Sequence, residues 1–135
     1  MATISKFEEL EIWQLARTQT CDFDKIIMRT ALAKDFALRN QMNSYSGSVM
    51  DNIAEGFERS GTNEFKNFQI IAKGSNGEFR SQLYRCLDRK YISEEEFDEL
   101  YAKNLLIGNK IMSFINYLKK TSFKGHGRRN DEASS

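Results

Sequence analysis

Not one of the 135 residues is proline, while apolar residues recur every three or four positions along most of the chain. Loop-rich and all-β folds normally contain proline in their turns and at the ends of their elements, so its absence favours long, uninterrupted helices. Apolar residues make up 40% of the chain, which is enough to bury the core of one domain of this length. The pattern therefore predicts an all-α protein with a single domain.

Four periodic stretches account for most of the chain. Their apolar spacing predicts helices over about 7–28, 35–57, 62–90 and 93–119. Thr62 is the expected N-cap of the third helix, and Ser93 with Glu96 forms a capping box at the start of the fourth. Because the connections are short, consecutive helices should pack as antiparallel neighbours. The prediction is an up-down-up-down four-helix bundle over residues 1–120.

Glycines and off-stripe apolar residues add expectations about packing. Gly56 is expected to end the second helix, and Gly74 and Gly77 are expected to mark tight helix contact rather than a local break. Several apolar residues lie off the main stripes and predict a self-association surface, with ordinary exposed apolar surface as the alternative. These residues are Ile12, Leu15, Ile70, Leu87, Leu106 and Ile107.

Charge is unevenly distributed along the chain. Residues 1–102 carry 13 Lys+Arg and 17 Asp+Glu, whereas residues 103–135 carry 7 and 2. A local basic run indicates attraction to a polyanion, although the net charge is only +1. The alternative is a solvated helix end whose cations suit the helix dipole. Residues 121–135 are expected to form a basic, disordered tail.

The residue types present exclude several classes of site. The only histidine is His126, so one chain cannot form a metal site with two histidines or a catalytic triad with a histidine in the core. It also lacks the spacing of a helical Arg-x4-His ribonuclease, because position 121 is Thr. No catalytic residue, metal or cofactor is expected.

Cys21 and Cys86 are too few for a disulfide scaffold and are expected to be reduced core residues of a cytoplasmic protein. No run of 18 apolar residues exists, so no membrane span is expected. The first residues lack the apolar core of a secretion signal.

Three separated motifs go beyond periodicity. They are Phe-Glu-Glu-Leu-Glu-Ile-Trp over residues 7–13, Asn-Ile-Ala-Glu-Gly within residues 48–59, and Ile-Ala-Lys-Gly-Ser over residues 71–75, followed by Glu78. Together they resemble a family of small bacterial four-helix bundles that was first noticed as products of intervening sequences within 23S ribosomal RNA genes. The resemblance spans about residues 7–118.

The resemblance implies a specific assembly and set of partners. That family forms a homopentamer with a central pore. Relatives of similar shape are accessory proteins of diversity-generating retroelements, where they bind the reverse transcriptase and nucleic acid through basic surface. No catalytic activity is attached to the family.

The motif residues themselves indicate a structural role. The set is Asn52, Ile53, Ala54, Glu55, Gly56, Arg59, Gly74 and Ser75. Asn52 is expected to be a buried amide that bonds the 58–62 loop or a neighbouring helix. Glu55 can pair with Arg59 four residues on, or across to Lys66 or Lys73. An active site at Asn52 and Glu55 is disfavoured, because no histidine, metal constellation or phosphate-binding loop lies near them in sequence.

Two functional hypotheses follow. The first is a non-enzymatic scaffold that binds RNA or DNA backbone without reading bases. Its candidate contacts are Lys66, Lys73, Arg80, Lys110, Lys119, Lys120, Lys124, Arg128 and Arg129. The first three are spaced by seven and line one helix face, although solubilising surface is the alternative.

The second hypothesis is a protein-interaction module. It is either an accessory subunit of a reverse transcriptase, whose basic end would face RNA or DNA, or an intervening-sequence protein without direct nucleic-acid binding. In it, the acidic cluster over residues 94–99 would face a basic partner. Helix capping already accounts for those acids.

Overall fold

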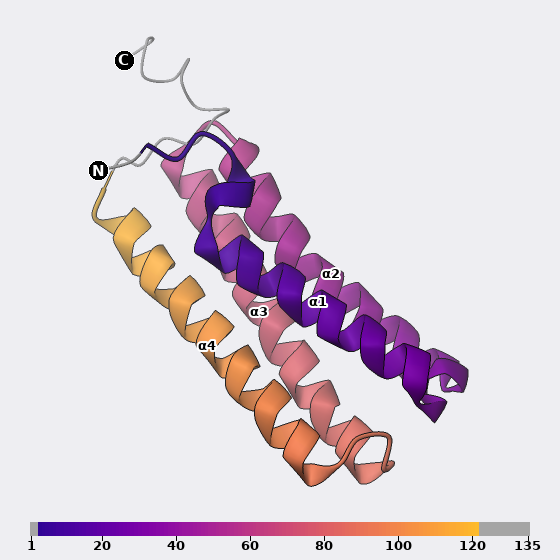
Figure 1. The fold of residues 1–135 in the computed structure, drawn as a ribbon. Helices are drawn as coiled ribbons and strands as arrows, with labels where there is room; N and C mark the ends of the chain where they lie inside the picture. The colour runs from indigo at the N-terminus through magenta and orange to yellow at the C-terminus, as the bar shows by residue number, and fades with distance from the viewer. Residues whose placement is uncertain (1–2, 122–135) are drawn as a thin grey trace.

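The computed structural model describes residues 3–121 of the chain, and four long helices make up most of this range (Figure 1). Two short 3₁₀ helices, η1 and η2, precede α1 and α2. The elements are η1 Phe7–Glu9, α1 Glu11–Arg29, η2 Ala31–Lys34, α2 Phe36–Glu58, α3 Thr62–Asp88 and α4 Glu94–Lys119. No strand occurs within the described range, which confirms the all-α class.

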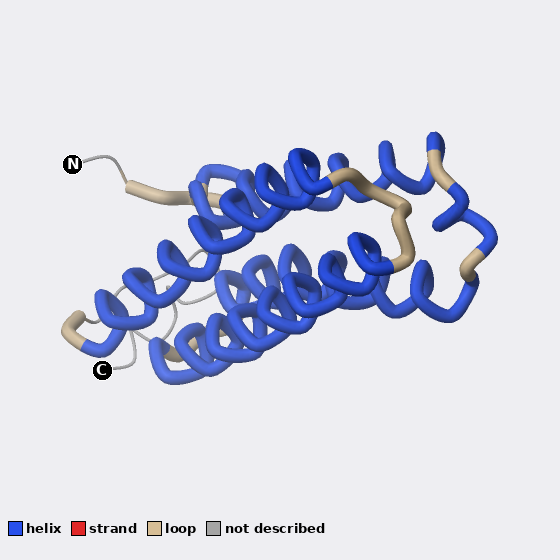
Figure 2. Tube along the Cα trace, turned by 90° about the horizontal axis from the view of Figure 1, so that it is seen from below, coloured by secondary structure: helices blue, strands red, loops and turns tan. Residues whose placement is uncertain are grey.

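The helices pack side by side, with their connections at the two ends of the bundle (Figure 2). At one end, Phe57 of α2 packs against Phe65 of α3 with ring centroids 5.9 Å apart. At the other end, Asp35, the N-cap of α2, pairs with Arg89, the C-cap of α3, at 2.5 Å. α2 and α3 are in contact along their length, whereas α1 and α4 meet least among the neighbouring helices. These contacts form a four-helix bundle.

Two apolar clusters fill the interior, one toward each end. The first, near the α2–α3 connection, contains Leu10, Ile12, Ala16, Val49, Ile53, Phe57, Phe65, Ala72, Ile107, Ile111, Ile115 and Leu118. The second, near the α3–α4 connection, contains Phe23, Ile26, Leu32, Leu38, Met42, Phe79, Leu83, Cys86, Ile92 and Phe97. Buried polar side chains lie between them in sequence on α1, α3 and α4, and they are described below.

The starts of two helices differ from the sequence-based boundaries. α1 begins at Glu11 rather than near residue 7, because Leu10 is buried in an extended conformation and separates it from η1. The N-cap of α3 is Gly61 rather than Thr62. Thr62 instead has helical geometry as the first residue of α3, so the expected cap is shifted by one position.

The predicted capping box of α4 is confirmed. Ser93 Oγ accepts a hydrogen bond from the Glu96 amide at 3.1 Å, and Glu96 Oε1 accepts one from the Ser93 amide at 3.1 Å. The backbone hydrogen bond from Ser93 holds the pKa of Glu96 below its usual range, and Arg29 at the end of α1 adds to this effect by pairing with Glu96. The local cap therefore also ties α4 to α1.

The predicted helix end at Gly56 is wrong, because α2 continues to Glu58. Gly56 is buried against α3. A Cβ atom there would lie 2.9 Å from Phe68 Cβ, 3.0 Å from Gln69 Nε2 and 3.1 Å from Phe65 Cδ1. Real Cβ atoms do not approach other carbons so closely, so glycine at this position permits α2 and α3 to touch.

The expected tight contact at Gly74 and Gly77 is also wrong. A Cβ atom at Gly74 would meet nothing within 4 Å, and one at Gly77 would meet only the Arg80 guanidinium at 4.0 Å. α3 continues through both glycines without a break. Their spacing resembled that of a packing stripe, but the partner helix lies on another face of α3.

The off-stripe apolar residues fall into different environments. Ile12 and Ile107 belong to the core, so their assignment to a self-association surface is wrong. Leu15 and Leu87 are half-buried. Ile70 and Leu106 are 49% and 46% exposed.

The two cysteines also differ in environment. Cys86 is buried as expected, but Cys21 is exposed and is not a core residue. Across residues 3–121, no helix combines the length and apolarity that a membrane span requires.

Replacing Lys90 with glycine should stabilise the fold. Lys90 follows the C-cap of α3 with φ of 62°, where its Cβ is crowded. The hydrogen bonds from the Tyr91 amide to Cys86 O and from the Lys90 amide to Leu87 O hold it there. We expect Lys90→Gly to raise the free energy of unfolding by about 1 kcal/mol, measured by urea denaturation. Lys34→Gly, in a segment without positive φ, is the control and should not stabilise. A lower free energy of unfolding for Lys90→Gly would contradict the strain argument.

Candidate nucleic-acid interface

The predicted basic residues come from α3, α4 and the segment after α4. Lys66, Lys73 and Arg80 lie on α3, while Lys110 and Lys119 lie on α4, with Lys120 as its C-cap. Lys124, Arg128 and Arg129, together with most of the predicted tail, lie outside the described residues. Six of the nine candidates can therefore be placed.

Two of the six are engaged by other side chains of the bundle. Lys110 Nζ pairs with Glu11 Oε1 of α1 at 3.0 Å. Arg80 Nη1 donates to Asn104 Oδ1 at 3.2 Å, and its guanidinium lies 6.0 Å from the Tyr101 ring centroid. A phosphate would have to compete with these contacts, so Lys110 in particular is a weaker candidate than its charge indicates.

The other four candidates have no ion pair with any described residue. Lys73, Lys119 and Lys120 are exposed, and Lys66 is half-buried. Phe65 packs against Phe114 with ring centroids 5.2 Å apart, so the start of α3 lies beside the last turns of α4. Lys66 is therefore at the same end of the bundle as Lys119 and Lys120.

Two cations at the opposite end of the α1–α4 side are paired with carboxylates. Lys103 lies 3.3 Å from Glu99 and 3.5 Å from Asp22, and its pKa is raised, first by Glu99 and then by Asp22. Arg29 pairs with Glu96 in the same recess between α1 and α4. These cations are matched by carboxylates, in contrast to the four lysines above.

The Asn-Ile-Ala-Glu-Gly motif serves the α2–α3 contact. Asn52 is half-buried and donates to Ser48 O and Ser48 Oγ of its own helix at 2.8 and 2.9 Å, so the expected bond to a loop or another helix is wrong. Ser48 Oγ lies 2.8 Å from Ser75 Oγ and carries the connection to α3. Glu55 pairs with Arg59 at 2.9 Å, the first of the predicted alternatives.

The other motif positions have plain structural environments. Ile53 is fully buried in the first apolar cluster, and Ala54 beside it is half-buried. The motif residues thus serve helix packing and hydrogen bonding.

Sequence reasoning missed a buried amide layer at the middle of the bundle. Asn104 Nδ2 donates to Gln19 Oε1 at 2.8 Å and to Asn76 Oδ1 at 3.0 Å, and Gln19 Nε2 donates to Asn76 Oδ1 at 3.1 Å. All three side chains are at least nine-tenths buried. Each lies at a step of three or four from apolar stripe residues, and that spacing was the available signal. The layer ties α1, α3 and α4 together.

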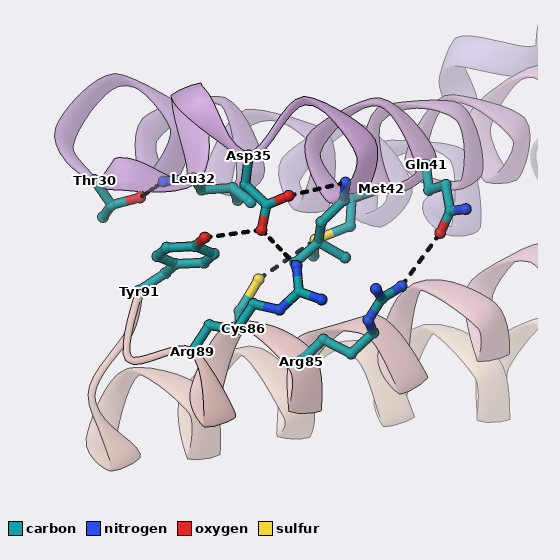
Figure 3. A network of polar contacts seen from close by, with 10 residues as sticks. Thr30, Leu32, Asp35, Gln41, Met42, Arg85, Cys86, Arg89 and Tyr91 are labelled. Carbon is teal, nitrogen blue, oxygen red and sulfur yellow. Dashed lines mark hydrogen bonds and ion pairs between the residues drawn. The ribbon is translucent and has the colours of Figure 1, made fainter.

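A second polar cluster joins α2 to the end of α3 (Figure 3). Asp35 accepts hydrogen bonds from Tyr91 Oη at 2.8 Å and from the Leu38 amide at 3.4 Å, in addition to its pair with Arg89. The Tyr91 hydroxyl makes the largest contribution to a lowered pKa of the Asp35 carboxyl, and Arg89 adds to it.

Beneath that cluster, burial raises the pKa of Cys86 to about 11, so this thiol is not a nucleophile. Within the described residues, no three His, Cys, Asp or Glu side chains are grouped to hold a metal ion.

An aromatic group on α3 and α4 was also missed. The Tyr84 ring centroid lies 4.7 Å from that of Phe97 and 6.0 Å from that of Tyr101, yet Tyr84 is 48% exposed. Arg80 contacts the same cluster through Tyr101. Tyr84 lies four residues after Arg80, about one helical turn on, and that spacing was the available signal.

Comparison with known proteins identifies relatives of the chain. Residues 8–113 match the family described as 23S rRNA-intervening sequence protein. Among solved structures, the chain is similar to a protein of unknown function from the S23 ribosomal protein family of Bacteroides thetaiotaomicron, with a TM-score of 0.70 and 19% identity over 77% of this chain and 97% of that one. No curated protein matches the chain. At this identity the structural likeness shows the fold, and the family match covers most of the sequence, so the chain belongs to the 23S rRNA-intervening sequence protein family.

Proposed function

We propose that the protein is a non-enzymatic, oligomeric scaffold that binds the backbone of RNA or DNA through basic surface. It would act as a cytoplasmic accessory to a reverse transcriptase or another RNA-processing partner. The observation that carries this proposal is that Lys66, Lys73, Lys119 and Lys120 of α3 and α4 make no ion pair with a described residue, whereas Lys103 and Lys110 of α4 are matched by carboxylates. The family's link to ribosomal RNA genes is consistent with an RNA-related role.

The lysines would act as phosphate contacts rather than base readers. A lysine ammonium neutralises phosphate as a point charge and releases condensed counterions, which gives affinity without sequence preference. The opposed helix ends seen at Phe57–Phe65 and Asp35–Arg89 support an antiparallel, up-down-up-down order. In that order Lys66 of α3 lies at the same end of the bundle as Lys119 and Lys120 of α4, and Lys73 lies farther along α3.

Self-association into a homopentameric ring would strengthen weak binding, because each patch would repeat five times. Exposed apolar side chains such as Ile71 and Leu106 support burial against another copy. Light scattering after gel filtration tests this directly. A particle near five times 15.7 kDa is the expected result, and a monomer would contradict the ring.

Removing the unpaired lysines should weaken nucleic-acid binding and reduce its salt dependence. For Lys73→Gln, Lys119→Gln and Lys120→Gln combined, we expect the slope of log K against log salt to fall by about 2 to 3. The control combines Lys25→Gln, Lys34→Gln and Lys90→Gln, which removes the same charge from exposed lysines elsewhere. Fluorescence anisotropy with a labelled RNA/DNA hybrid measures both. Equal losses in the two variants would show that net charge alone matters and would contradict a localised interface.

The alternative is a protein-interaction module without direct nucleic-acid binding. Glu94, Glu95, Asp98 and Glu99 are all exposed on the first turns of α4, and they favour a basic protein partner. If the unmodified protein binds neither RNA nor DNA at low salt, this alternative replaces the scaffold. A pull-down with a reverse transcriptase encoded beside the gene would then test the partner.

A further inference from the structure

One face of α3 alternates cations with uncharged residues, of which Ile70 and Tyr84 are exposed and Gly77 is half-buried. At steps of four and three it comprises Lys66, Ile70, Lys73, Gly77, Arg80 and Tyr84. The matching positions of α4 are Tyr101, Leu105, Gly108 and Met112. None of these ten positions, which we call the α3–α4 face, carries a carboxylate. The face therefore combines positive charge with apolar surface, which suits a ligand that is both anionic and aromatic.

Contacts between the two helices define the α3–α4 face. Arg80 bonds Asn104 and lies over the Tyr101 ring, and a Cβ atom at Gly108 would lie 3.9 Å from Arg80 Nη1. Tyr84 packs against Tyr101 and Phe97. Arg80 and Tyr84 are thus neighbours at one end of the face, about one helical turn apart.

Tyr84 is both anchored and accessible. Its ring rests on Phe97 and Tyr101, which restrict its motion, while 48% of the residue remains exposed. An aromatic side chain that is already held in place loses little conformational entropy when a second ring stacks on it. Such anchored, half-exposed aromatics beside cations are how proteins hold unpaired bases.

We infer that the α3–α4 face binds single-stranded nucleic acid, with an unpaired base stacked on Tyr84 beside Arg80 and the backbone following Lys73 and Lys66. The inference rests on the proposed function and names its substrate class. A duplex covers the faces of its bases with neighbouring pairs, so it would meet the lysines but not the tyrosine. From Lys66 to Tyr84 the face extends about 27 Å along α3, which gives a strand room to lie along the helix.

The test compares three labelled ligands of equal length: an oligothymidylate strand, an abasic strand with the same phosphates, and a duplex. Anisotropy titrations use the unmodified chain, Tyr84→Ala, Tyr84→Leu, which keeps apolar bulk without an aromatic ring, and Tyr84→Phe, which keeps the ring. Tyr117→Ala is the matched control, because Tyr117 is 44% exposed on α4 at a position outside the α3–α4 face. Circular dichroism and light scattering confirm fold and assembly for each variant.

We expect Tyr84→Ala and Tyr84→Leu to weaken binding of the thymidylate strand about tenfold, with Tyr84→Phe and Tyr117→Ala unchanged. Binding of the abasic strand and of the duplex should not change, nor should the salt slope for any ligand. If Tyr84→Ala lost the same affinity for all three ligands, or none for the thymidylate strand, the stacking inference would be overturned. The proposed scaffold function would remain. A change in particle mass for Tyr84→Ala would show that the α3–α4 face contacts a second copy of the chain, and this result would also overturn the stacking inference. Failure of the unmodified protein to bind any ligand would overturn the scaffold itself.

Discussion

Asn104→Ala should lower the free energy of unfolding by about 3 kcal/mol, measured by urea denaturation followed by circular dichroism. The Asn104 amide donates to Gln19, to the Asn76 side chain and to the Asn76 carbonyl, and its oxygen accepts from Arg80. Alanine would leave buried amides without their partners, each at about 1 to 3 kcal/mol, and would leave a cavity as well. The substitution would remove hydrogen bonds that join α1, α3 and α4, so the packing of all three helices would be weakened.

The control is Asn109→Ala on the same helix, where the side chain is exposed and the change should be within about 0.5 kcal/mol. A double-mutant cycle with Gln19→Ala adds a second check. Because both residues belong to one buried network, the double variant should lose less than the sum of the two single losses. Strict additivity would contradict the network, even if Asn104→Ala alone is destabilising.

Gly56→Ala should also destabilise the bundle, by about 2 kcal/mol, because the added methyl would overlap the Cβ of Phe68. A Cβ atom cannot turn away as the end of a flexible side chain can, so α2 and α3 would have to separate along their most extensive contact. Thermal denaturation measures the effect.

Gly47→Ala is the matched control on the same helix. A Cβ atom there would meet nothing within 4 Å, so alanine should stabilise α2 by about 0.5 to 1 kcal/mol through its better helix propensity. The two substitutions are chemically identical and are expected to have opposite signs. If both stabilise, Gly56 is not a packing constraint, and the closeness of α2 and α3 must have another cause.

Much of the fold could be predicted because its signals are local. The apolar spacing placed four helices with ends close to those observed, and the Ser93–Glu96 capping box was identified in full. The Glu55–Arg59 ion pair, four residues apart at the end of α2, is another local feature that was predicted. Each of these features depends on residues three or four apart, whose positions follow from helix geometry alone.

The candidate site was harder to predict, because charge in the sequence does not show which cations are free. Lys110 and Lys73 look alike in sequence, yet Lys110 is paired with Glu11 and Lys73 is exposed without an ion pair to a described residue. Arg80 was grouped with the lysines but is bonded to Asn104. Tyr84 was overlooked because it is held in place by contacts with Phe97 and Tyr101 of another helix.

The sequence by itself determined the four helices, the capping box of α4 and the family, because periodicity, capping and motif order are properties of neighbouring residues. Only the tertiary structure decided that Gly56 packs against α3 while Gly74 faces open space, and that Asn104 lies in a buried layer with Gln19. Gln19 and Asn104 are 85 positions apart. Whether such residues meet depends on how whole helices are rotated and aligned against each other, and the stripe of each helix constrains that arrangement only loosely.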